Sequence, residues 1–249
     1  MKNTEKLLKK ELDKKWLSIV IILFLNTFLY GQSNCTFIYV IDDTTHGHSY
    51  EKYNETLDMQ KVLNEEKSGF FGFIGLNYKR LCITFTSIIK NKDNSNIYEV
   101  EGFSTVMNKN KRNFRGTFTL ISYYRLLEPS LDSLKEGDNE GFSTFSYILK
   151  EDEKLSATGV FEGEMLVLWY KDKGKQPDYS SLFDFGDPAG NYKFLGTWTS
   201  YRTKKSSVAS WGKERIPCSD NFDIGASEFS PNPGYYKYGW EEFKHKYGK

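Results

Sequence analysis

The sequence has few of the residues on which common catalytic and metal sites depend. Its 249 residues include three cysteines and three histidines. There is no Cys-x-x-Cys pair, and the cysteine spacings do not match a zinc site. No Gly-x-Ser-x-Gly motif is present, and His46, His48 and His245 are the histidines available to a serine nucleophile, so a Ser-His-Asp enzyme is disfavoured. The sequence predicts no cofactor, and we expect a protein without catalytic activity.

A hydrophobic run long enough to span a membrane is also missing at the start of the chain. The apolar segment from Trp16 to Tyr30 is shorter than the roughly 20 residues that a spanning helix needs. It follows a lysine-rich stretch and is followed by the small residues Gly31 and Ser33. This order is typical of a secretory signal peptide, so we expect residues 1–33 to be one, with cleavage after Gly31 or Ser33. A retained N-terminal anchor is the alternative.

The remaining residues, 34–249, are expected to form a single secreted or periplasmic domain with no stable membrane span after cleavage. Across the whole chain, 34 lysines and arginines are interspersed with 33 acidic residues. A near-neutral, mixed surface argues against nucleic acid as a main partner. An oxidising destination permits one disulfide among Cys35, Cys82 and Cys218, and all three pairings are open.

Aromatic residues are abundant, with 19 Phe, 17 Tyr and 5 Trp, and this enrichment is typical of β-sheets. Short loops between successive strands predict an antiparallel meander of about 8–9 strands, either a barrel or a sandwich. A short peripheral helix is expected within Tyr50–Lys67. The expected strands are Cys35–Ile41, Phe71–Leu76, Arg80–Lys90, Ile97–Met107, Phe114–Leu126, Phe142–Lys150, Leu155–Tyr170, Tyr192–Tyr201 and Phe222–Phe229.

One pattern recurs in three of these strands: an aromatic residue, any residue, glycine, any residue and a large apolar residue. It occurs in Phe114–Phe118, Phe161–Met165 and Phe194–Trp198. Glycine inside a strand marks a bend or a close approach of another backbone. Repeated at comparable points, it lets a sheet coil enough to close, which favours a barrel over a sandwich.

The segment Gly196-Thr197-Trp198 resembles the G-x-W strand of the lipocalin and avidin group of up-and-down barrels, the calycins. The resemblance implies a lipocalin-like barrel. Side chains alternate between the two faces of a strand, so large residues that share a face with these glycines are expected to line the interior. If that interior is open, an apolar ligand would contact them. The predicted ligand-binding residues are Phe118, Met165, Trp169 and Trp198.

These features favour a secreted binding or interaction module, whose partner would be a small apolar ligand, a glycan or a protein. A secreted hydrolase with paired carboxylates is one alternative, and an envelope-associated structural protein is another. The hydrolase needs two acids in one cleft. Its candidate acids are Glu162, Glu164, Asp184, Asp187, Glu214 and Asp223.

His46 and His48 are the weak candidates for a metal site. They stand two residues apart beside Asp42 and Asp43, and imidazole and carboxylate together can hold a divalent ion. A solvated turn is the more common role of such a pair, so no metal is predicted.

Overall fold

The computed structural model describes residues 35–128, 137–179, 191–226 and 228–244. The predicted signal peptide, residues 1–33, lies outside them. The chain divides into two compact units, Met1–Cys35 and Thr36–Lys249, and every helix and strand named below belongs to the second. No helix in the described ranges is both long enough and apolar enough to cross a membrane.

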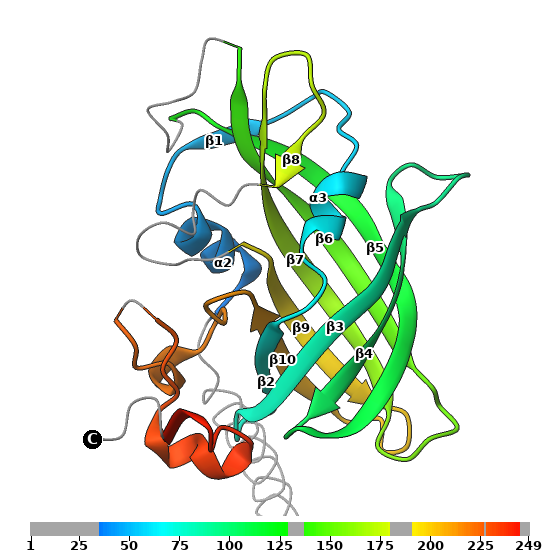
Figure 1. Ribbon diagram of the computed structural model, residues 1–249, viewed down its shortest axis with the longest axis vertical. Coiled ribbons are helices and arrows are strands. Elements are labelled where there is room, and N and C mark those ends of the chain that lie inside the picture. Colours follow the sequence, from blue (N-terminus) through cyan, green and yellow to red (C-terminus); the bar gives the residue numbers. More distant parts are fainter. Residues whose placement is uncertain (1–34, 129–136, 180–190, 227, 245–249) are drawn as a thin grey trace, which may run out of the picture. The chain divides into compact units, whose positions relative to one another are not determined.

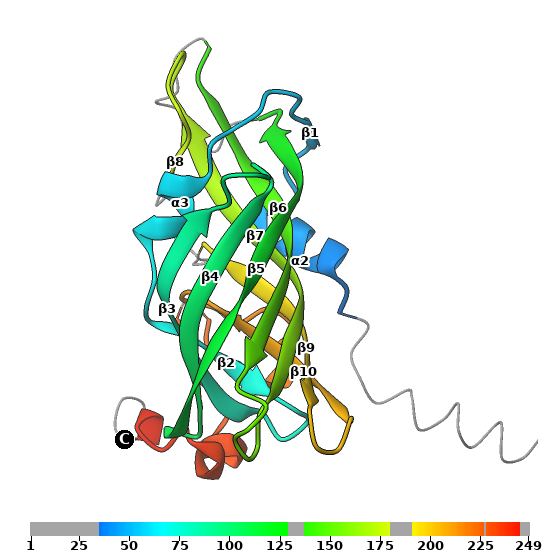
Figure 2. The same ribbon diagram turned by 90° about the vertical axis from the view of Figure 1, so that its right-hand side faces the viewer.

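Eight strands of a 10-stranded antiparallel sheet close into a ring (Figures 1 and 2). Along the ring each strand pairs with the next, and β10 pairs back with β2. Two short strands lie off the ring: β1 (Tyr50–Lys52) pairs with β5, and β8 (Asp178–Tyr179) pairs with β7. The ring strands are β2 (Phe70–Ile74), β3 (Lys79–Lys90), β4 (Ile97–Val106), β5 (Lys109–Leu126), β6 (Asn139–Glu151), β7 (Gly159–Lys171), β9 (Lys193–Ser200) and β10 (Ser206–Gly212).

The predicted mainly β fold with an antiparallel meander is confirmed, and its closure is barrel-like. The expected strands from Phe71–Leu76 through Tyr192–Tyr201 correspond to β2–β7 and β9. β10 is not among the expected strands, because Ser206–Gly212 is a short run of mostly small residues. It is the strand that completes the ring.

The expected first strand, Cys35–Ile41, is wrong, because this segment forms helix α2 (Phe37–Thr44). Thr36 caps the helix, since its side chain accepts a hydrogen bond from the Tyr39 amide. Phe37 and Ile41, one helical turn apart, pack against an apolar cluster on the outside of the ring. Contacts at helical spacing therefore outweigh the strand preference of this β-branched and aromatic run.

The expected strand Phe222–Phe229 is also wrong. Its start is the 3₁₀ turn η2 (Asp220–Phe222), and the loop that follows is held by Asp223 Oδ1, which accepts hydrogen bonds from the amides of Gly225 and Ser230. The chain then enters η3 (Pro233–Tyr238). Together these turns cover the outside of β2, where Phe73 and Trp240 are buried in one cluster with Phe222.

The short helix expected within Tyr50–Lys67 is α3, Gln60–Glu65. It is not peripheral, because Val62 and Leu63 are buried in the core. Residues 53–63, here called the plug, bury apolar side chains in the core of the ring. Hydroxyl groups on the strands bind the plug's backbone: Tyr98 accepts from the Met59 amide at 3.2 Å, and Tyr123 donates to the Leu57 carbonyl at 2.8 Å. The plug therefore packs into the ring at the end where α3, β1 and β8 lie (Figure 1). Its buried side chains are Tyr53, Leu57, Met59, Val62 and Leu63.

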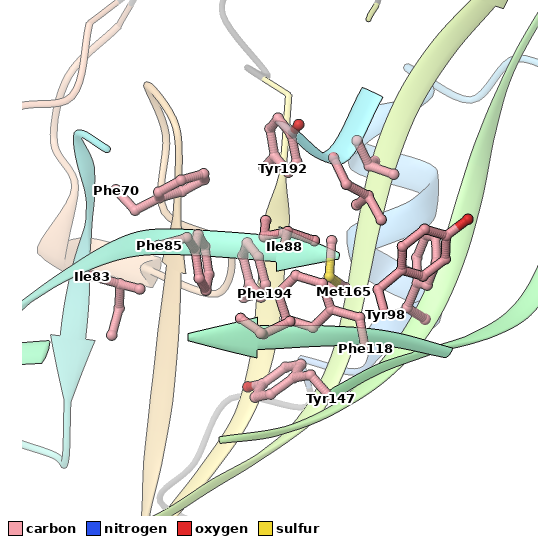
Figure 3. Packing of buried hydrophobic residues seen from close by; sticks show 14 of the residues in the cluster. Phe70, Ile83, Phe85, Ile88, Tyr98, Phe118, Tyr147, Met165, Tyr192 and Phe194 are labelled. Atoms are coloured by element: carbon pink, nitrogen blue, oxygen red, sulfur yellow. The ribbon is translucent and has the colours of Figure 1, made fainter. Parts of the chain in front are cut away.

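Aromatic rings fill the middle of the ring of strands. Figure 3 shows Phe85, Phe118 and Phe194 turned toward one another from β3, β5 and β9. Their ring centroids lie 5.5–6.0 Å apart, and Trp211 stacks on Phe194 at 4.9 Å. Such contacts stabilise a core beyond the burial of apolar area.

The glycine pattern has a direct steric cause. Gly163 and Gly196 lie opposite each other on β7 and β9, and the Tyr147 hydroxyl lies over both. A Cβ added to Gly196 would lie 2.5 Å from that hydroxyl and 2.1 Å from the Glu162 carbonyl oxygen. The glycines thus give the neighbouring ring and backbone the room that closure requires.

The structure identifies which cysteines are disulfide-bonded. Cys35 and Cys218 are disulfide-bonded, and Cys82 is a free thiol on β3. The open question of which cysteine is left over is answered in favour of Cys82.

Candidate functional site

The end of the ring opposite the plug is open. The hairpin connections β2–β3, β4–β5, β6–β7 and β9–β10 gather there (Figure 1). They surround a cavity of about 630 Å³, here called the hairpin-end pocket. Its lining residues are Ile74, Gly75, Leu76, Asn77, Lys79, Ser104, Val106, Met107, Lys109, Asn110, Arg112, Glu151, Ala157, Phe161, Trp198 and Ser207.

The pocket has an apolar side and a polar side. The indole of Trp198 on β9 forms an aromatic wall, and the buried ring of Phe161 on the neighbouring strand β7 packs behind it, with ring centroids 6.5 Å apart. Leu76, in the β2–β3 connection, is 72% exposed at the rim. The polar side consists of Ser104, Arg112 and Glu151, with Lys79 and Lys109 near the mouth.

Glu151 is the buried carboxyl of this pocket. It is the last residue of β6, and strand alternation places it on the same inner face as Tyr147 and Leu149. Only 6% of it is exposed. Its Oε1 accepts from Ser104 Oγ at 2.7 Å, and its Oε2 accepts from the Gly159 amide at 2.8 Å and from Trp198 Nε1 at 3.0 Å.

Burial raises the pKa of the Glu151 carboxyl above its ordinary value of 4.5. The hydrogen bonds from Ser104, Trp198 and the Gly159 amide lower the pKa, as does the nearby charge of Arg112, but they offset only part of the desolvation. All three hydrogen-bond donors are neutral, and no cation among the described residues contacts the carboxylate directly. The net effect is a pKa above that of a carboxyl in water.

Arg112 lies on the inner side of β5 with part of its hydrogen-bonding capacity unused. A guanidinium has five N–H donors. Nη1 donates to the Lys111 carbonyl at 3.3 Å and Nη2 to the Ser156 carbonyl at 3.0 Å. Nε is buried and has no hydrogen-bond partner within the described ranges. A buried N–H without a partner costs roughly 1–3 kcal/mol, so an added acceptor here would be stabilising.

Protonation of Glu151 is expected to stabilise the fold. Because the folded-state pKa is raised, the stability contribution of Glu151 is fully present below pH 4.5 and is lost as the pH rises through the raised pKa. Glu151→Gln removes this titration, and its amide can still accept from Gly159 and Trp198 while donating to Ser104.

The measurement is urea unfolding of both proteins at about pH 4 and about pH 7.5. Relative to Glu151→Gln, the wild type should be more stable at the lower pH than at the higher one. Glu162→Gln, an exposed position on β7, controls for the loss of one negative charge. A stability difference between wild type and Glu151→Gln that is the same at both pH values would contradict the prediction.

The four residues predicted to line the interior lie at different depths. Phe118, Met165 and Trp169 are fully packed in the core, and Trp169 lies 5.6 Å from Tyr53 of the plug. Trp198 is partly buried and lines the hairpin-end pocket. The structure therefore brings one of the four to the open cavity, and a binding role for these residues stays a prediction.

His46 and His48 follow the C-terminus of α2. His46 lines a separate polar cavity of about 360 Å³ together with Asp43 and Arg215. Among the described residues, no cluster of three or more His, Cys, Asp or Glu side chains could hold a metal ion.

The candidate acids of a hydrolase are dispersed in the structure. Glu162 and Glu164 lie on the outer face of β7, and Asp223 pairs with Arg215 at 2.7 Å. Glu214 follows β10, in the turn that leads to Arg215. Asp184 and Asp187 lie outside the described residues.

Glu151, Ser104 and Arg112 were missed from the sequence. Glu151 was assigned to the turn after a strand ending at Lys150, so its face was not considered. The available signal was alternation: one more residue of strand puts Glu151 in line with Tyr147 and Leu149. A carboxylate continuing an inward apolar row is the kind of buried polar group that marks a site.

No protein-family model matches this chain, and comparisons with curated proteins and with solved structures also find no match. The pocket's own geometry is therefore the basis for interpreting its function.

Proposed function

We propose that this chain is an exported binding protein that holds a small ligand in the hairpin-end pocket and has no catalytic activity. The observation that carries the proposal is the asymmetry of the ring, which is filled by plug side chains at one end and has a cavity at the other. A cavity of about 630 Å³ falls within the range of small-molecule sites. Its mixture of an aromatic wall with a few fixed polar groups is also typical of such sites.

The composition of the pocket favours binding over hydrolysis. Glu151 is the sole acid among the described residues that line it, whereas glycoside hydrolysis uses two carboxyl groups about 5–10 Å apart. The Glu151 oxygens already accept three hydrogen bonds from the protein. This arrangement suits a fixed polar group in a binding site better than an acid that must move protons in a reaction.

Two features support an extracellular or periplasmic location. The first is the predicted signal peptide, residues 1–33. The second is the disulfide bonding of Cys35 and Cys218, since disulfides persist in oxidising compartments.

Filling the pocket is the test of the proposed function. N-phenyl-1-naphthylamine, a neutral dye whose fluorescence rises in apolar surroundings, is titrated into the mature protein. Ser207→Trp places a large side chain in the pocket lining and is expected to weaken dye binding by about tenfold or more.

The matched control is Ser206→Trp, one residue earlier on β10. Ser206 is exposed, and its hydroxyl bonds to Thr199 on the outer face. Its replacement should leave the dissociation constant within about twofold of the wild type. Equal binding by both variants would reject the hairpin-end pocket as the ligand site.

A further inference from the structure

We propose that the ligand of the hairpin-end pocket is an anionic amphiphile, with an apolar body against Trp198 and one oxyanion group bound by Arg112. The shared chemistry is a single carboxylate, sulfonate or similar group on a largely apolar molecule. This inference rests on the proposed function and adds the class of ligand.

The charges around the pocket favour an anion. Lys79, Lys109 and Arg112 line it, against the one carboxyl of Glu151. Both lysines are exposed, and neither forms an ion pair with any residue that the structure describes. Lys79 begins β3 and Lys109 begins β5, so each stands where its strand leaves the mouth. Such a mouth attracts negatively charged molecules.

Arg112 has the donors to receive the anion. Its hydrogen bonds to the carbonyl groups of Lys111 and Ser156 hold the guanidinium in place from one side. The remaining donors are not used by Glu151, whose oxygens bind Ser104, Gly159 and Trp198 instead. A guanidinium held in this way binds an oxyanion with charge-assisted hydrogen bonds at little cost in side-chain entropy.

Glu151 is compatible with a neighbouring anion. Its two oxygens accept hydrogen bonds from Ser104, the Gly159 amide and Trp198, and these donors partly screen the carboxyl from a negatively charged ligand. Its hydrogen bond to Trp198 Nε1, at 3.0 Å, also fixes the indole that forms the apolar wall. One residue therefore positions the apolar surface while leaving Arg112 available for the ligand's charge.

The apolar side of the pocket fits the ligand's body. Ile74 and Val106 also line the pocket, and Leu76 is largely exposed at its rim. Apolar side chains that line a concave site are typical of sites that bind a partly apolar ligand. A fully polar anion such as inorganic phosphate would leave this side of the pocket without a contact.

The experiment compares two dyes that differ by one sulfonate: 1-anilinonaphthalene-8-sulfonate and neutral N-phenyl-1-naphthylamine. Wild-type protein is expected to bind the sulfonate about tenfold or more tightly than the neutral dye. Arg112→Met should bring the ratio of the two dissociation constants close to one. High salt should weaken binding of the sulfonate while leaving the neutral dye unaffected.

Arg115→Met is the matched control. Arg115 lies on the same strand but on the outer face, where its side chain is 84% exposed and paired with Glu101, so this variant should keep the wild-type ratio. If Arg112→Met does not fold, the double variant Lys79→Met/Lys109→Met, at two exposed positions, replaces it and should lower the ratio about threefold or more.

The outcomes separate this inference from the proposed function. If both dyes bind equally well and Ser207→Trp blocks both, the inference of an anionic ligand is overturned, but the pocket is still the binding site. A preference for the sulfonate that survives Arg112→Met also overturns it. Failure of both dyes to bind would reject the proposed function itself.

Discussion

Replacing Phe194 with alanine is expected to lower the free energy of unfolding by about 3–5 kcal/mol. Phe194 is fully buried on β9 at the centre of the ring (Figure 3). Removing its ring would leave a cavity that surrounding strands, paired on both sides, cannot easily collapse into. Its ring contacts Phe70, Phe85, Phe118, Tyr147 and Trp211 at centroid distances of 4.9–6.0 Å.

Urea unfolding followed by circular dichroism measures this loss. Ile148→Ala is the control, because Ile148 is 42% exposed on the outer face of β6, and its truncation should cost no more than about 1 kcal/mol. If Phe194→Ala were as mild as the control, the aromatic centre would not be the main source of stability.

Gly196→Ala is expected to destabilise the protein by about 2–3 kcal/mol, although it adds a single methyl group. The new Cβ would lie 2.1 Å from the Glu162 carbonyl oxygen and 2.5 Å from the Tyr147 hydroxyl. Both distances are far below van der Waals contact, so β7 and β9 would have to separate or Tyr147 would have to move. The loss arises from overpacking rather than from a cavity.

A second substitution tests the cause. Tyr147→Phe removes the hydroxyl, so in the Gly196→Ala background it should restore part of the lost stability, and the backbone clash with Glu162 should keep the rest. Gly234→Ala is the control: the nearest atom to an added Cβ is 3.5 Å away, so stability should change by less than about 0.5 kcal/mol. Purely additive effects of the Gly196 and Tyr147 substitutions would show that the hydroxyl is not the obstacle.

The strands were predictable because their signals are local. Each signal, the alternation along β7 or the glycine within β5, β7 or β9, spans only a few residues of one strand. Together these signals predict a sheet that coils until it closes. Helix α2 was mistaken for a strand because Phe37 and Ile41 find their partners on the outside of the ring. That surface is assembled from distant parts of the chain.

The candidate site was less predictable for the same reason. Trp198 could be assigned to the inner face from alternation alone, but which end of the ring holds a cavity depends on where the plug packs. The plug fills the opposite end through hydroxyl groups that bind its backbone, such as Tyr123 to the Leu57 carbonyl. Nothing local indicates that residues 53–63 enter the ring. Glu151 would have been assigned to the inner face if the expected strand had been extended by one residue. Strand ends are where pattern-based assignment is weakest.

The pairing of β10 with β2 has a consequence for how the protein reaches its folded state. Every other neighbour in the ring is also the neighbouring ring strand along the chain, so those hairpins can form as the polypeptide emerges. The β2–β10 seam joins segments near opposite ends of the domain, and its closure must wait for almost the whole chain. During folding, the plug residues can therefore pack on an open sheet before the last strand pairs and encloses them.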